Sequence, residues 1–170
     1  ISFGPVIGIY ADSSELDMQA GGQIKIEATI NGSTSNNNLA AINAKDSKID
    51  IKAEKGIEIG AANRAAEGAI QDENVYAIYA DKSEVALDGC RSGISIRGNV
   101  NVSNNSVLKL SGQTGIMNMG GGILRSAISG STTSVGNLNV DNSKLVVDGF
   151  TGISGITTCL LYTSPSPRDQ

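Results

Sequence analysis

Short runs in which apolar and polar residues alternate recur along the chain, and five of them align on a serine. Two and four positions after each serine the residue is apolar in every repeat, and a second apolar pair lies a few positions before it. The fourth repeat carries one extra residue in that interval. Alternation of this kind is typical of a half-buried strand. The pattern predicts two short strands per repeat, joined at Ser14, Ser47, Ser83, Ser106 and Ser143.

A third apolar pair follows about ten residues after most of these serines, usually behind a glycine. Gly56 precedes Ile57 and Ile59, and Gly115 precedes Ile116 in the fourth repeat. Glycine enters a tight corner at low steric cost. Each repeat is therefore expected to contain three short strands.

Two-residue hairpin loops do not recur at a fixed place, so antiparallel hairpins are disfavoured. Stacked triangular coils would instead place equivalent strands in parallel register about 4.8 Å apart. We predict an all-β fold, a right-handed parallel β-helix (β-solenoid) of about five irregular three-strand coils. Its outward positions are charged, as a solvated face requires. They include Glu15, Asp17, Lys48, Asp50, Glu84, Lys109 and Lys144.

The recurring serine has two interpretations, a stacked hydroxyl ladder that caps a turn or a contact to a ligand. The structural interpretation is favoured, because a nucleophile is one activated copy with a hydrogen-bonded base. Here five copies occur in a chain without histidine. We expect the serines to be structural anchors of the repeat.

The spacings between successive serines are 33, 36, 23 and 37 residues, so three repeats carry extra sequence. The extra residues follow the third strand each time, within 28–40, 60–75 and 120–136. These excursions are either loops stacked along one side, where recognition is commonly found, or additional short strands that make some coils four-sided. The pattern leaves both alternatives open.

Composition narrows the function classes. The 170 residues include 21 Gly, four Tyr, two Phe and no Trp, with a net charge of −4. Nucleic acid is an unexpected partner because no basic stripe exists to neutralise phosphates. Membrane insertion is not expected either, since no apolar run reaches about 18 residues.

Residues that could support catalysis are scattered. Histidine is absent and the carboxylates do not follow a calcium-loop spacing, so we expect no catalytic residue, no metal site and no cofactor. Asp17 and Asp50 are interpreted as part of a solvated face. The candidate ligand-binding residues are Tyr10, Tyr76 and Tyr79, whose rings could stack on sugars. Tyr10 and Tyr79 occupy the same outward position in two repeats.

The last twelve residues, CLLYTSPSPRDQ, break the pattern. Residues 159–169 resemble a translated sequencing-library adapter, with a natural Pro/Ser linker as the alternative. We expect residues 1–158 to be a solenoid fragment of a longer repeat protein and 159–170 to be a non-native, disordered tail. Without Cys159, Cys90 has no intrachain partner for a disulfide.

The phrases GIYADSSELDM, AIYADKSEVALDG and GNLNVDNSKLVVDGFTGI resemble the passenger regions of bacterial autotransporter adhesins and surface carbohydrate-binding β-helix proteins. The resemblance implies a bacterial cell-surface or extracellular location and a non-catalytic adhesin or structural passenger segment. A host surface or matrix component is then the expected partner. One alternative is a module that binds a polysaccharide, and a less favoured one is a polysaccharide lyase or hydrolase. Unpaired strand edges at the ends of the fragment predict end-to-end self-association.

Overall fold

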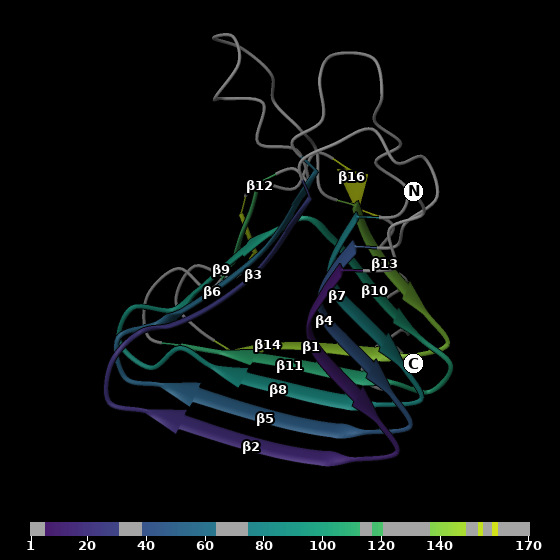
Figure 1. The fold of residues 1–170 in the computed structure, drawn as a ribbon, viewed down its shortest axis with the longest axis horizontal. Helices are drawn as coiled ribbons and strands as arrows, with labels where there is room; N and C mark the ends of the chain where they lie inside the picture. The colour runs from purple at the N-terminus through teal and green to yellow at the C-terminus, as the bar shows by residue number, and fades with distance from the viewer. Residues whose placement is uncertain are drawn as a thin grey trace, which may run out of the picture.

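The computed structural model describes residues 6–30, 39–63, 75–112, 117–120, 137–148, 153–154 and 158–159. All secondary structure in these ranges is β-strand, arranged as three parallel sheets around a triangular core (Figure 1). Sheet A contains β1 (Val6–Asp12), β4 (Leu39–Lys45), β7 (Val75–Asp81), β10 (Asn99–Ser103), β13 (Asn137–Asp141) and β16 (Thr158–Cys159).

The other two sheets form the remaining sides of the triangle. Sheet B contains β2 (Glu15–Ala20), β5 (Lys48–Ala53), β8 (Glu84–Asp88), β11 (Val107–Ser111) and β14 (Lys144–Asp148). Sheet C contains β3 (Ile24–Ile30), β6 (Ile57–Asn63), β9 (Ile94–Arg97), β12 (Met117–Gly120) and β15 (Ile153–Ser154). In each sheet every strand pairs with the equivalent strand of the next coil.

This topology confirms the predicted solenoid. The chain passes from sheet A to sheet B to sheet C in each of five coils, and β16 then returns to sheet A. In Figure 1 the chain turns clockwise as it recedes from the first coil toward the later ones, so the helix is right-handed.

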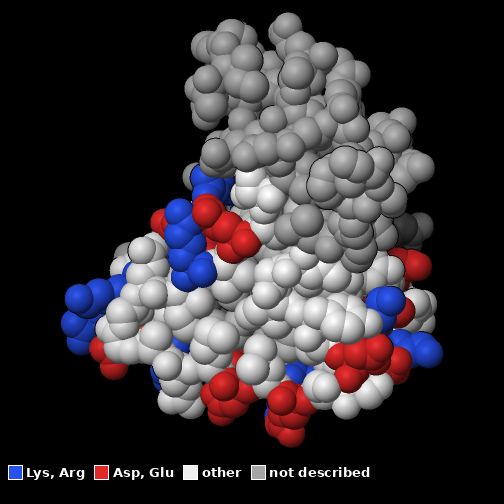
Figure 2. Space-filling view, in the orientation of Figure 1, with Lys and Arg blue, Asp and Glu red and all other residues white. Residues whose placement is uncertain are grey.

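Aliphatic ladders fill the interior as the alternation predicts. The inward residues of the middle coils, such as Ile51, Leu87 and Leu110, are buried. Leu16 in the first coil and Leu145 in the fifth are only partly buried, because each has a neighbouring coil on one side only. Figure 2 looks onto the first coil and shows charged side chains around the rim with uncharged atoms in the middle.

Two local details differ from the sequence pattern. The ladder partner of Ile153 in β12 is Met117 and not Ile116, so the predicted alignment of the fourth repeat was wrong by one residue. Sheet A also contains a register shift, because Asn99 pairs with Tyr76 and Val100 with Ile78, which leaves Ala77 as an extra residue in β7. A break of this kind shifts the alternation of the strand.

All three long connections join sheet C to sheet A, and the same corner is crossed through Gly98 alone between β9 and β10. The position expected for the excursions is therefore confirmed. Whether they contain extra strands falls on residues outside the described ranges, as does the segment 160–170 of the expected tail. In the described ranges no helix is long and apolar enough to cross a membrane.

Candidate functional site

The five serines stack at the corner between sheets A and B. Ser83 Oγ donates to the carbonyl of Asp81 at 2.8 Å and accepts the amide proton of Ser47 at 3.0 Å. Ser83 in turn donates its own amide proton to Ser106 Oγ at 2.9 Å. The same inter-coil bond joins Ser14 to Ser47 and Ser106 to Ser143. The hydroxyls form a directional ladder that connects all five coils.

A left-handed backbone residue precedes each serine and turns the chain through the corner. These residues are Ser13, Asp46, Lys82, Asn105 and Asn142, with φ between 44° and 64°. The fourth coil accommodates its extra residue by placing a second asparagine, Asn104, in the same region. Asparagine and aspartate tolerate this conformation better than most residues.

A surface hollow of about 530 Å³ runs along this corner, and its walls include Ser47, Ser83, Lys48 and Glu84. The hydroxyls of Ser47 and Ser83 are occupied, because each donates to a backbone carbonyl and accepts a backbone amide proton. A hydroxyl held in this way has no base to activate it. The serines therefore maintain the corner and offer no nucleophile to the hollow.

The outer face of sheet A carries a row of tyrosine and asparagine side chains. Register places Tyr10, Asn43, Tyr79, Asn101 and Asn139 at equivalent positions of successive strands. We call these residues the tyrosine–asparagine row. The predicted equivalence of Tyr10 and Tyr79 is confirmed, whereas their role in binding stays a prediction.

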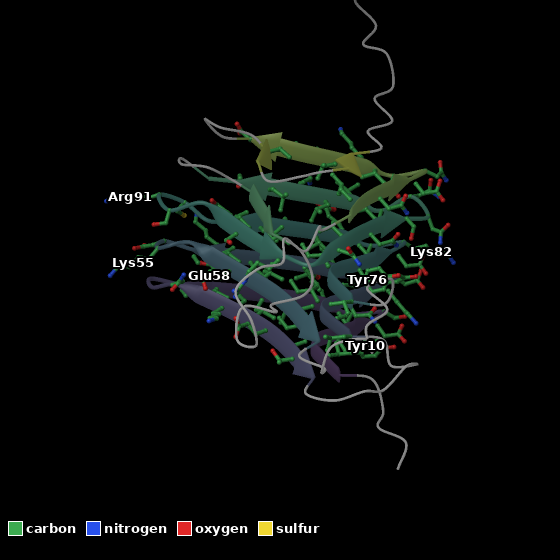
Figure 3. The ribbon with its side chains drawn as sticks, turned by 90° about the horizontal axis from the view of Figure 1, so that it is seen from above. Tyr10, Lys55, Glu58, Tyr76, Lys82 and Arg91 are labelled. Carbon is green, nitrogen blue, oxygen red and sulfur yellow. The ribbon has the colours of Figure 1, made fainter. Side chains whose placement is uncertain are left out.

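The three candidate tyrosines differ in their surroundings. Tyr10 is 55% exposed, and its hydroxyl donates to Asp12 Oδ2 at 3.1 Å. The rings of Tyr76 and Tyr79 lie edge to face with centroids 5.2 Å apart. Both residues belong to β7, and side chains three positions apart in a regular strand point to opposite faces of the sheet. Here the two residues between them, Ala77 and Ile78, are both buried, so the alternation is interrupted. Figure 3 shows Tyr10 and Tyr76 on the same side of the solenoid, away from Lys55 and Arg91.

The asparagines of the row are partly satisfied by one another. Asn139 Nδ2 donates to Asn101 Oδ1 at 2.8 Å, and Asn101 Nδ2 donates to Ser103 Oγ at 3.2 Å. Asn43 Oδ1 is buried and accepts no hydrogen bond within the described part of the chain. A buried acceptor without a donor is uncommon and requires an explanation. Asn43 lies between Tyr10 and Tyr79 in the row.

Charged residues flank the row on its sheet B side. The register aligns Asp12, Lys45, Asp81, Ser103 and Asp141. Asn104 Nδ2 donates to Asp81 Oδ1 at 2.6 Å. The flanking positions thus hold three carboxylates and one ammonium group, which makes this edge of the row acidic.

The outer faces of sheets B and C carry charges that pair from one coil to another. Lys48 contacts Glu15 at 3.5 Å, and Arg97 contacts Glu27 at 2.8 Å across the intervening strand at Gly60. These pairs are partly exposed and each stabilises the fold only slightly. They are features of a solvated surface, as the outward alternation predicts.

Two further groups of side chains could in principle bind a metal ion or react. Asp17 and Asp50 are neighbours across β2 and β5, yet in the described ranges no three His, Cys, Asp or Glu side chains gather as a metal site requires. Desolvation, followed by the nearby Asp88 carboxylate, raises the pKa of the Cys90 thiol. A raised thiol pKa lowers the thiolate fraction, so Cys90 is not activated.

The tyrosine–asparagine row is thus the candidate binding surface within the described part of the chain. Sequence reasoning found its tyrosines but missed Asn43, although the residue after the inward isoleucine of β1, β4 and β7 would have identified it. Comparison with family models, curated proteins and solved structures found no match.

Proposed function

We propose that this chain is a non-catalytic segment of an extracellular bacterial adhesin, in which a stiff solenoid holds binding surfaces away from the cell. The observation that supports this proposal best is the serine ladder, since it repeats one corner through five coils. Repeats that contact only their neighbours build elongated structures. Such a structure suits a stalk or passenger region better than an enclosed active site.

The resemblance to autotransporter passenger regions points the same way, and it also supplies the expected partner, a component of the host surface or matrix. The acidic flank of sheet A and the paired charges of sheet B give a hydrated exterior. Rigid scaffolds of this kind commonly carry recognition residues on their surface.

Beads coated with the 170-residue chain provide a direct test. We expect them to adhere to epithelial cells or to surfaces coated with matrix protein, and adhesion should disappear after the chain is heat-unfolded. In parallel, incubation with pectin-like polymers should release no reducing sugar. The proposal would be overturned if the beads adhered to none of these surfaces, or if sugar release rose with protein concentration.

A further inference from the structure

The tyrosine–asparagine row combines aromatic rings with carboxamides along one straight line. Equivalent residues of neighbouring parallel strands lie about 4.8 Å apart, so Tyr10 and Tyr79 are separated by roughly 10 Å with Asn43 between them. A partner with one repeating unit per strand spacing would meet the same kind of contact at every step along the solenoid axis.

An extended glycan has this form, because its sugar rings follow one another at about the spacing of neighbouring strands. The apolar face of a pyranose ring stacks on an aromatic ring, while its hydroxyls donate and accept hydrogen bonds around the edge. Tyrosine offers a large amphipathic surface at low entropic cost. Carboxamides offer two donors and an acceptor each.

We propose that the tyrosine–asparagine row binds a neutral glycan chain that lies parallel to the solenoid axis, an inference that rests on the adhesive role proposed above. Two sugar rings stack on Tyr10 and Tyr79. The ring between them lies over Asn43, the residue aligned between the two tyrosines. Later rings contact Asn101 and Asn139.

The charges beside the row select the type of glycan. Asp12, Asp81 and Asp141 flank it, with Lys45 as the one cation aligned with them. Carboxylates repel uronic acids, sulfates and phosphates, so an anionic polysaccharide or a nucleic acid is disfavoured. A protein partner is also a poor fit, because protein-binding hot spots lie in well-packed, fully desolvated pockets. Tyr10 instead stands among amides and carboxylates.

Binding to soluble polymers tests this inference directly. The 170-residue chain is titrated with mixed-linkage β-glucan, hydroxyethyl cellulose and galactomannan as neutral probes, and with polygalacturonate as the anionic probe. We expect binding to at least one neutral polymer and weaker binding to polygalacturonate. Tyr10→Ala and Tyr79→Ala should each weaken the neutral interaction roughly three- to tenfold, the effect of losing one aromatic stack.

Matched variants distinguish loss of the aromatic ring from damage to the fold. Tyr10→Phe keeps the ring and should retain binding, and Lys144→Ala on sheet B should leave the affinity unchanged. Tyr79 contacts Tyr76, so Tyr79→Ala is interpreted only if its circular dichroism matches the parent. Tyr10→Ala removes an exposed side chain and remains decisive in any case.

Several results would overturn the glycan inference. They are absence of binding to every neutral polymer, affinity for polygalacturonate equal to that for neutral polymers, and unchanged affinity in Tyr10→Ala. Bead adhesion before and after periodate oxidation of the cell-surface glycans distinguishes this failure from failure of the adhesin proposal. If adhesion survives periodate treatment and no polymer binds, only the glycan inference is contradicted. If the beads bind a polymer but adhere to no cell or matrix surface, the glycan site is supported and the adhesive role is contradicted.

Discussion

Two corners of the solenoid are crossed in opposite ways. Between sheets A and B the chain turns within two to three residues in every coil, and a serine hydroxyl connects each coil to the next. Between sheets C and A the connection is Gly98 alone in one coil and residues 31–38, 64–74 or 121–136 in three others. The two corners lie at opposite ends of the strands of sheet A.

The difference shows what makes a corner uniform. At the A/B corner the amide of one serine must meet the hydroxyl of the next, so a change in length moves a bonded atom away from its partner. The extra residue of the fourth coil is tolerated because Asn104 and Asn105 are both left-handed and Ser106 Oγ still reaches the Ser103 carbonyl at 2.6 Å. Among the residues that the structure describes, no comparable serine ladder runs along the C/A corner.

Insertion should have the largest effect, and it should depend on the corner. Adding Gly-Ser-Gly-Ser between Lys82 and Ser83 displaces the hydroxyl that accepts from Ser47 and the amide that donates to Ser106. Two unsatisfied buried groups cost about 2–6 kcal/mol of unfolding free energy. The same four residues between positions 129 and 130 lengthen an already long connection and should cost below about 1 kcal/mol.

Urea unfolding followed by far-ultraviolet circular dichroism measures both insertions. A large loss at positions 129–130 would indicate that 121–136 contributes strands to a sheet, the four-sided alternative. Equal small losses at both sites would show that the serine ladder does not constrain the A/B corner.

Ser83→Ala should produce the next largest effect. Ser83 is 4% exposed, and its removal leaves the Ser47 amide without an acceptor, which costs about 1–3 kcal/mol. Ser83→Thr keeps the hydroxyl and should recover most of this loss. Ser14→Ala is the matched control, because Ser14 is exposed and, within the described ranges, its hydroxyl bonds only to the Asp12 carbonyl. A Ser14→Ala loss as large as that of Ser83→Ala in thermal unfolding would contradict the ladder.

Gly98→Ala tests the short crossing of the C/A corner. Gly98 has a φ of +128°, and a Cβ there would lie 2.9 Å from the Ala77 amide nitrogen. We expect a loss of about 1–3 kcal/mol from backbone strain and this close contact. Gly21→Ala is the control, since a Cβ at Gly21 meets no atom within 4 Å. Equal thermal midpoints for the two variants would show that the short crossing is not strained.

Much of this comparison could be predicted from the sequence. Period-two alternation on both sides of a recurring serine identified the coils, their parallel stacking and the side chains that face inward. It also located the excursions after the third strand. These features repeat locally, so several similar segments reinforce each prediction.

The remaining details depend on contacts between residues far apart in the chain. The bonding partners of each serine lie in another coil, and the Arg97–Glu27 pair joins residues 70 positions apart. The break in alternation at Ala77 places Tyr76 beside Tyr79, although a regular strand would put them on opposite faces. The repeat could have aligned Asn43 with Tyr10 and Tyr79, but the burial of its Oδ1 without a hydrogen-bond donor depends on the folded structure.

The smallest expected effect concerns the charged side chains on the outer surface beside the A/B corner. The hydrogen bond from Lys109 lowers the pKa of the Glu84 carboxyl, and burial opposes this shift. A lowered folded pKa stabilises the fold above about pH 4.3, the value for an unfolded glutamate, and this stabilisation is lost as the pH falls through the folded pKa. The Glu84 side chain is 38% exposed, so solvent screening limits the contribution to about 0.5 kcal/mol.

Glu84→Gln and Lys109→Met should each lower the urea midpoint slightly at pH 7, and this effect should diminish as the pH falls through the folded pKa of Glu84. In 1 M salt the difference at pH 7 should shrink, because the Debye length falls to about 3 Å, whereas the loss in Ser83→Ala should persist. A Glu84→Gln loss that equals that of Ser83→Ala and disappears in salt would mean that an exposed ion pair contributes as much as a buried serine hydroxyl to holding neighbouring coils together at this corner.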